Sequence, residues 1–275
     1  MRAISLGYHD VICCAGPLVN SPRDKSVYTL RRDEFVHHLH MIRSRTGPVR
    51  VRVVQKHVDP AGSDPIYLTF DDGAACGYVC VAQELEKMDW RGHFFITTDW
   101  IGRPGFLHRQ QIRELYERGH VIGSHSCSHP ERMSHLKWDE LVREWRESCA
   151  VLANIIGEPV KVASVPGGYY SRKVARSAAA SGVEVLFTSE PTTAAALVDG
   201  CLVLGRYSVR RFTSASVGSA IAAGARWPRF RQAALWYAVK GVKRMTGPWY
   251  YPIRRFLLGA VNNQDDCRSL LRRSP

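Results

Sequence analysis

The sequence predicts an α/β protein built on a mainly parallel sheet, and two observations support this prediction. Strand-like and helix-like segments alternate along most of the chain, and repeated β-then-α order places successive strands parallel in one sheet. Several short apolar runs also end abruptly in polar residues, as buried parallel strands do at the rim of a sheet. The sheet is either open or closed into a barrel, and in both architectures ligands bind at the carboxyl ends of the strands.

The expected elements follow in order. A short strand over residues 3–6 leads into Tyr8-His9-Asp10, and apolar residues then recur at helical spacing over 35–42. Three histidines of that helix are expected on solvated faces: His37, His38 and His40. The later strand-like segments are 66–70, 93–97, 120–123, 160–165, 183–188 and 201–204. The helix-like segments are 79–88, 110–118, 138–156 and 172–180.

The composition is that of an ordinary globular chain with an unusual charge. The 275 residues are enough for one large α/β domain and a full core. The net charge of +13 favours an anionic partner, which could be nucleic acid, anionic lipid or a phosphorylated substrate. Eight cysteines without paired spacing are expected to be reduced thiols, with Cys76 and Cys80 on ordinary helix positions near the core. Together with the lack of a signal-peptide pattern, this predicts a cytoplasmic protein.

The composition changes near residue 225, which predicts a main domain over 1–225 and a basic tail over 226–275. The tail has eleven Lys or Arg residues and two acids, so it carries +9 of the net charge. Gly247-Pro248 divides it into two expected helices, and the first places Trp227, Phe230, Ala234 and Ala238 on one stripe. A basic, aromatic amphipathic segment suits a membrane surface. The alternative is a terminal helix that packs its aromatic residues on the main domain.

The stretch Ile66-Tyr67-Leu68-Thr69-Phe70-Asp71-Asp72-Gly73 ends an apolar run in two carboxylates. Adjacent side chains on an extended chain point to opposite sides, so Asp71 and Asp72 can take different roles, one binding a metal and the other handling a proton. Taken alone, the Asp-Gly pair favours a turn between two strands over a functional site.

A second strand-like run ends in His125-Ser126-Cys127-Ser128-His129-Pro130. Two imidazoles and one carboxylate form a common open metal site that leaves positions for water and substrate. Histidines four residues apart are weak evidence alone. They become strong evidence when they are paired with strand-end aspartates in the same α/β domain.

These two motifs resemble those of the metal-dependent polysaccharide deacetylases, carbohydrate esterase family four, which include the chitooligosaccharide deacetylases. The segments Tyr8-His9-Asp10 and Gly92-His93-Phe94-Phe95 support the resemblance, which covers roughly residues 4–212. It implies a distorted (β/α) barrel, here with a basic, aromatic C-terminal helical extension. Its groove would hold a divalent metal, usually zinc (Zn2+).

Carried over by position, the resemblance implies Asp72, His125 and His129 as metal ligands and Asp71 as the general base. Val165-Pro166-Gly167-Gly168-Tyr169 matches the third motif of the family. This match implies that the amide of Gly167 faces the oxyanion and that Tyr169 contacts substrate.

The sequence departs from the family pattern at two positions. Ser164 stands where the third motif opens with an arginine that orients the base, and the segment 202–207 contains no histidine to serve as general acid. His9 is the first substitute for that acid because it too follows an early strand. Arg206 either binds substrate or tunes a carboxylate.

The sequence therefore predicts a metal-dependent hydrolase that removes an N-acetyl group from a sugar or polysaccharide. A lipid-linked glycan precursor at the inner membrane face is the substrate that the tail suggests. One alternative is a catalytically impaired carbohydrate-binding relative at the membrane surface. Another is a nucleic-acid-binding protein, but the basic residues lie in a tail without a base-reading module, so no nucleic acid partner is expected.

Overall fold

A computed structural model describes residues 2–12, 25–47, 50–54 and 64–246. Its main sheet has nine strands, which are parallel except for β9, antiparallel to β10. In sheet order the strands are β11 (Tyr207–Ser208), β1 (Ile4–Tyr8), β4 (Ile66–Phe70), β5 (His93–Ile96), β6 (Val121–Ser124), β7 (Val162–Ser164), β8 (Val185–Phe187), β10 (Cys201–Leu204) and β9 (Ala196–Val198). Strands β2 (Asp10–Ile12) and β3 (Thr29–Arg31) form a separate parallel pair.

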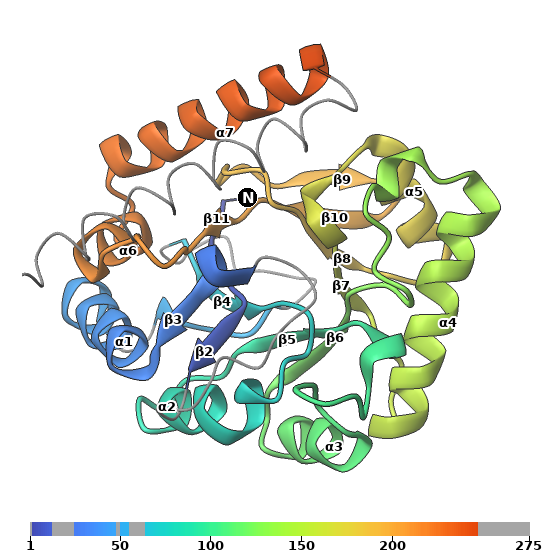
Figure 1. The fold of residues 1–275 in the computed structure, drawn as a ribbon, viewed down its shortest axis with the longest axis horizontal. Helices are drawn as coiled ribbons and strands as arrows, with labels where there is room; N and C mark the ends of the chain where they lie inside the picture. Colours follow the sequence, from blue (N-terminus) through green and yellow to red (C-terminus); the bar gives the residue numbers. More distant parts are fainter. Residues whose placement is uncertain (1, 13–24, 48–49, 55–63, 247–275) are drawn as a thin grey trace, which may run out of the picture. The chain divides into compact units, whose positions relative to one another are not determined.

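The main sheet curls into a half-barrel, with helices around its outside (Figure 1). An isolated antiparallel bridge between Arg2 and Ala194 brings the start of β1 close to the edge strand β9. The amide of Ala3 also donates to the carbonyl of Thr193 over 3.0 Å. The distorted (β/α) barrel expected from the sequence is confirmed.

The helices begin and end where local sequence signals allow it. Ser171 and Ser214 cap α5 and α6 by accepting the amides of Val174 and Val217. Gly157 ends α4 in the left-handed conformation, with φ of 82°. The helices are α1 (Arg32–Thr46), α2 (Ala82–Glu86), α3 (Arg109–Glu117), α4 (Trp138–Ile156), α5 (Arg172–Ala180), α6 (Ala215–Ala222) and α7 (Arg226–Thr246). A π-helical turn, η3 (Gly77–Val81), leads into α2.

The core fixes the ends of the central strands β1, β4 and β5. All five residues of β4 are buried, and the ring of Phe70 stacks between Tyr8 and Phe94 with centroids 5.4 and 5.1 Å away. Phe70 immediately precedes Asp71, so the packing of these three rings holds the carboxyl end of β4 rigidly. A rigid strand is a more exact support for reacting groups than a loop.

His38 does not lie on a solvated face, so that expectation was wrong. It is buried on α1 against α6, and its Nε2 lies 3.0 Å from the carbonyl of Thr213. Helix α6 approaches this closely because Gly218 has no side chain: a Cβ there would lie 3.1 Å from His38 Nδ1. His37 and His40 are exposed, as expected.

No disulfide joins the cysteines in the described parts of the chain, which are Cys76, Cys80, Cys127, Cys149 and Cys201. Cys80 is buried and Cys76 lies at the start of η3, near the core. Cys13 and Cys14 lie outside the described residues, as does the second expected tail helix after Gly247. The chain divides into two compact units, Met1–Phe230 and Arg231–Pro275.

His93 should make the stability of this protein depend on pH. It is fully buried, its Nε2 accepts the amide of Val54 over 2.9 Å, and its Nδ1 donates to the carbonyl of Leu68 over 3.0 Å. Burial lowers its pKa from 6.5 to about 4. The unfolded chain therefore binds the extra proton first, so this contribution to stability is complete above pH 6.5 and is lost as the pH falls toward 4.

The loss should amount to about 3 kcal/mol in the free energy of unfolding. Urea unfolding of the wild type and His93→Gln between pH 7 and pH 4 measures it, because glutamine keeps an acceptor and a donor but does not titrate. Parallel pH profiles for the two proteins would contradict the prediction.

Candidate active site

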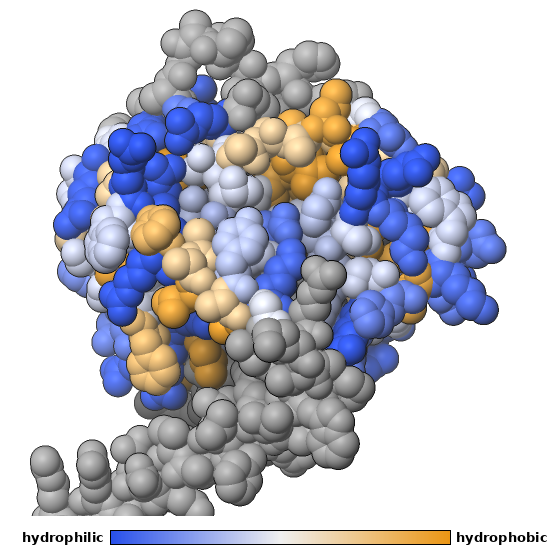
Figure 2. Space-filling model, turned by 90° about the horizontal axis from the view of Figure 1, so that it is seen from above, coloured by the Kyte–Doolittle hydropathy of each residue, from blue (hydrophilic) through white to orange (hydrophobic). Residues whose placement is uncertain are grey.

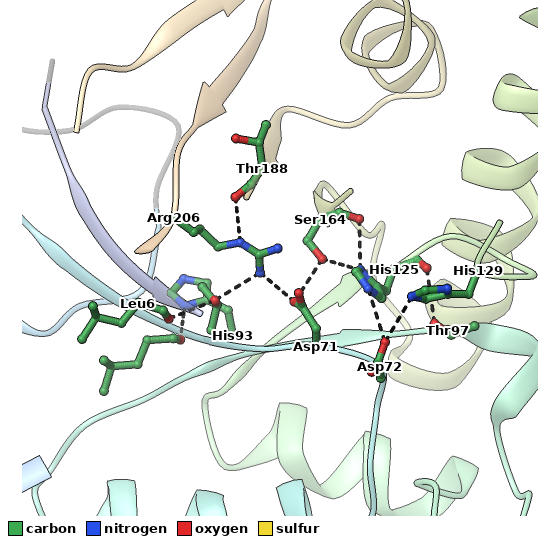
Figure 3. Close-up of polar contacts among 12 residues, drawn as sticks. Leu6, Asp71, Asp72, His93, Thr97, His125, His129, Ser164, Thr188 and Arg206 are labelled. Atoms are coloured by element: carbon green, nitrogen blue, oxygen red, sulfur yellow. Dashed lines mark hydrogen bonds and ion pairs between the residues drawn. The ribbon is translucent and has the colours of Figure 1, made fainter. Parts of the chain in front are cut away.

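Asp71 and Asp72 follow β4 directly and are both buried, with 5% and 4% of their surface exposed. The amide of Asp71 donates to the carbonyl of Tyr8 over 3.1 Å, which ties the strand end to β1. Their carboxylates point to different neighbours: Asp72 faces two histidines and Asp71 faces Ser164 and Arg206 (Figure 3). The geometry at the end of β4 thus directs the two carboxylates to different neighbours.

Asp72, His125 and His129 form a cluster that could hold a metal ion. Their nearest ligand atoms all lie within 4.8 Å of one another. Asp72 Oδ1 is 3.5 Å from His125 Nε2 and 3.4 Å from His129 Nε2. Ligand atoms about 2.1 Å from one tetrahedral ion lie about 3.4 Å apart, so the cluster fits a single small cation.

Backbone strain gathers at this cluster. Asp72, Ser126 and His129 have positive φ angles of 74°, 64° and 56°, a region that residues with a side chain rarely adopt. Such conformations cost roughly 1–3 kcal/mol each and are kept where the structure needs a special geometry. Two of these three residues belong to the proposed ligand set, which supports a functional origin for the strain.

Glu144 of α4 holds the loop after β6 in place through hydrogen bonds. Glu144 Oε2 accepts the amides of Cys127 and Ser128, each over 2.9 Å, and its Oε1 accepts the Ser128 hydroxyl over 2.7 Å. Ser126 Oγ accepts the amide of His129 over 3.1 Å. The side chain of Trp100 stacks on His129 at 5.0 Å. These contacts fix the positions of both imidazoles.

The ring of His125 is oriented by Ser164 at the end of β7. His125 Nδ1 lies 3.1 Å from the Ser164 carbonyl oxygen and 2.5 Å from its Oγ. A carbonyl can only accept, so these contacts assign the proton to Nδ1 and leave the lone pair of Nε2 toward Asp72. This is the tautomer that a metal ligand requires.

Asp71 has both of its hydrogen-bond partners on one oxygen. Its Oδ1 accepts Arg206 Nη1 over 2.6 Å and Ser164 Oγ over 3.2 Å. Among the described residues, its Oδ2 has no hydrogen-bond partner. Burial alone would raise the pKa of Asp71, but the Arg206 guanidinium, with smaller contributions from His125 and His9, holds that pKa below its ordinary value. Asp71 is therefore ionised at neutral pH and has one oxygen ready to accept a proton.

His9 lies at the same rim, just after β1. Its ring packs on Tyr28 with centroids 4.6 Å apart. Its Nδ1 is buried without a hydrogen-bond partner among the described residues. Burial lowers its pKa, and the charges of Asp71 and Asp72 raise it in part, so His9 is close enough to sense both acids.

Gly167 and Tyr169 follow β7, in and just after the turn η6 (Pro166–Gly168). Gly167 is exposed with φ of 61°, a conformation that favours glycine. A Cβ at this position would also lie 3.3 Å from the carbonyl of Glu131. Tyr169 is half-buried, and the guanidinium of Arg132 lies 5.9 Å from its ring centroid.

Arg206 lies between β10 and β11 with 2% of its surface exposed. Of its two expected roles, substrate binding and tuning of a carboxylate, this position favours the second. The sequence analysis did not identify Glu144, Trp100 or Tyr28. Only Glu144 had a signal, because it is an acid on the buried stripe of α4.

The fold and this rim define a distorted (β/α) barrel with a candidate metal site at the carboxyl ends of its strands. Residues 59–186 match the family model for polysaccharide deacetylases. The matched residues make up just under half of the chain and include Asp71, Asp72, His125 and His129.

Two curated relatives illustrate the similarity. The chain is 25% identical over 168 residues to the peptidoglycan-N-acetylglucosamine deacetylase of Bacillus cereus, a match that covers 61% of this chain and 56% of the relative. It is 40% identical over 68 residues to the peptidoglycan-N-acetylmuramic acid deacetylase PdaA of Bacillus subtilis, covering 24% of each chain. These matches span about a quarter to just over half of the relatives' own length.

Solved structures share the fold at low sequence identity. The Streptococcus pyogenes deacetylase PplD superposes with a TM-score of 0.65 at 19% identity, over 78% of this chain and 95% of that structure. IcaB from Ammonifex degensii superposes with a TM-score of 0.61 at 21% identity, over 80% and 97%. At this level of identity the likeness concerns the fold alone.

Proposed function

We propose that this protein is a metal-dependent hydrolase that removes the N-acetyl group from an N-acetylated carbohydrate. The observation that carries the proposal is the division of labour between two neighbouring acids at the end of β4. Asp72 faces His125 and His129, while Asp71 keeps one oxygen free beside them. This is the arrangement that hydrolysis of an amide by an activated water needs.

The proposed mechanism assigns one task to each residue. Asp72, His125 and His129 would hold a divalent cation, and one carboxylate with two imidazoles favours Zn2+. When bound there, the cation would polarise the acetamido carbonyl and acidify a water. Asp71 Oδ2 takes the proton of the attacking water. The amide of Gly167 donates to the carbonyl oxygen as negative charge develops on it.

His9 is proposed to deliver the proton to the leaving amine. Because burial keeps the ring neutral at rest, His9 would pass on the proton that Asp71 has taken up. Replacement His9→Ala should then lower kcat by about a hundredfold or more with little change in metal content. An His9→Ala enzyme with full kcat would instead mean that Asp71 returns the proton itself.

Acetate release over a panel of N-acetylated glycans tests the function. Wild-type protein with stoichiometric metal should release acetate from at least one of them, and free amine should appear in equal amount. Stoichiometric metal without acetate release from any glycan would favour the alternative, a catalytically impaired carbohydrate-binding relative.

The tail is proposed to hold the enzyme at an anionic membrane surface. Trp227 and Phe230 at the start of α7 are 71% and 64% exposed. The helix sequence contains six Lys or Arg residues and no acid. No helix in the described ranges is both long and apolar enough to cross a bilayer. An exposed aromatic stripe with surrounding positive charge suits the interfacial region of anionic lipid.

A surface location suggests a lipid-linked glycan precursor as the substrate and the inner membrane face as the site of action. The described surface also carries other apolar patches between hydrophilic areas (Figure 2), so the test needs a control outside α7.

Flotation with vesicles tests the membrane proposal. The full chain should float with vesicles that contain anionic lipid and should float less at high salt, because salt screens the basic residues. The double variant Trp227→Ser/Phe230→Ser should lose binding. Phe212→Ser is the matched control, since Phe212 is 86% exposed but lies outside α7. Failure of the full chain to float with anionic vesicles would refute the proposal.

A further inference from the structure

We infer that Arg206 is the positioning residue of the base Asp71 and fills the role left open by Ser164 in the third motif. The inference rests on the proposed function, because it concerns the same reaction. Arg206 directly precedes β11, two positions from β4 in the order of the sheet, and lies 135 residues after Asp71 in the chain. Its position is therefore a product of the fold and not of a local motif.

The guanidinium of Arg206 is fixed directly by residues of two strand ends, those of β4 and β8, and indirectly by β1. Nη1 donates to Asp71 Oδ1 over 2.6 Å and to Thr69 Oγ1 over 3.2 Å. Nε donates to the carbonyl of Thr188 over 2.9 Å. The hydroxyl of Thr69 in turn donates to the carbonyl of Leu6 over 3.1 Å. Strands β1, β4 and β8 thus determine where the positive charge lies, and the charge determines how the carboxylate is turned (Figure 3).

The backbone next to Arg206 leaves it little freedom. The amide of Arg206 donates to the carbonyl of Glu190 over 3.0 Å. A Cβ at Gly205 would lie 2.3 Å from that same carbonyl oxygen and 2.6 Å from the carbonyl oxygen of Thr192. Only glycine permits so close an approach of two backbones. Gly205 therefore sets the point from which the Arg206 side chain enters the site.

An ion pair with a purely structural role would engage both oxygens of the carboxylate. In this chain Arg118 and Glu86 form such a pair: Nε and Nη2 of the arginine bind the two oxygens of Glu86, each over 2.8 Å. Arg206 instead binds only Oδ1 of Asp71, and Ser164 Oγ binds that same oxygen. Both contacts leave Oδ2 without a partner among the described residues, which is the arrangement expected around a base.

The surroundings of Arg206 also favour positioning of Asp71 over a direct role in substrate binding. Arg206 is 2% exposed, and Phe95 lies beneath its guanidinium at 5.7 Å. Ser164 contributes to the same arrangement by linking the carboxylate to His125 Nδ1. A short side chain at position 164 leaves room for a guanidinium that comes from the segment between β10 and β11.

Kinetics of Arg206 variants test the inference. Arg206→Lys keeps a positive charge but loses the planar guanidinium, so kcat should fall about tenfold. Arg206→Ala loses both the charge and the guanidinium, so kcat should fall about a hundredfold. KM and metal content should stay within about twofold of wild type. Added guanidinium ion at millimolar concentration should restore part of the kcat of Arg206→Ala only. The control Arg118→Lys should keep wild-type kcat.

The possible failures can be told apart. Full kcat in Arg206→Ala, or a raised KM with unchanged kcat, would overturn the role of Arg206 while wild-type acetate release still supported the proposed function. A low kcat without rescue in a variant that binds metal and melts like wild type would also overturn it. Absence of acetate release by the wild type would overturn the proposed function itself, and with it the inference.

Discussion

Replacement Asp71→Asn should leave the metal site intact and lower kcat by about a hundredfold to ten-thousandfold. Asparagine has nearly the shape of aspartate, and its carbonyl oxygen can still accept from Arg206 and Ser164. The atom in place of Oδ2 becomes an NH2 group, which donates and cannot take a proton from water. The base is then lost while the surrounding geometry is kept.

Metal content and acetate release measured on the same samples check this expectation. Asp71→Asn should bind one equivalent of metal with wild-type affinity and release almost no acetate. Asp72→Asn is the matched variant, because it removes a charge of the same size one residue away and should weaken metal binding instead. If Asp71→Asn loses its metal and Asp72→Asn keeps it, the two aspartates have exchanged roles.

Local patterns in the sequence were enough to predict the rim of the sheet. The apolar run before Asp71 and the one before His125 both end in charged or polar groups, and parallel strands bring such ends to one edge. Hence the fold and the convergence of Asp72 with two histidines could be expected before the structure. These local patterns could not predict whether the sheet stays open or closes into a barrel. That depends on how strongly the sheet curls and on the bridge from Arg2 to Ala194.

Contacts between distant parts of the chain were beyond sequence reasoning. Arg206 directly precedes β11, and its partner Asp71 follows β4, two positions away in the order of the sheet but 135 residues earlier in the chain, so no spacing in the sequence points to this pair. His38 was misplaced for a similar reason. Its burial depends on Gly218, whose missing side chain lets α6 cover that face of α1. Both cases concern a polar side chain whose surroundings come from a segment far along the chain.

Removal of the metal is expected to abolish acetate release and to lower thermal stability together. A ligand that binds only the folded state adds about 2.7 kcal/mol to the free energy of unfolding when its concentration is a hundred times Kd. The site should depend on its cation in particular, because the strained backbone at Asp72 and His129 presents two of the three proposed ligands to the same point. Chelation should therefore lower Tm, and added Zn2+ should restore both Tm and activity.

Two histidine variants separate this effect from general damage. His129→Ala removes a proposed ligand, so its Tm should no longer respond to chelator or Zn2+ at concentrations that act on the wild type. His135→Ala is the control, because His135 is exposed and does not belong to the cluster, and its response should equal that of the wild type. If the wild-type Tm is unchanged by chelation while acetate release persists, Asp72, His125 and His129 hold no essential metal. In that case Asp71 would have to activate the attacking water without a metal, with only the charge of Arg206 beside its carboxylate.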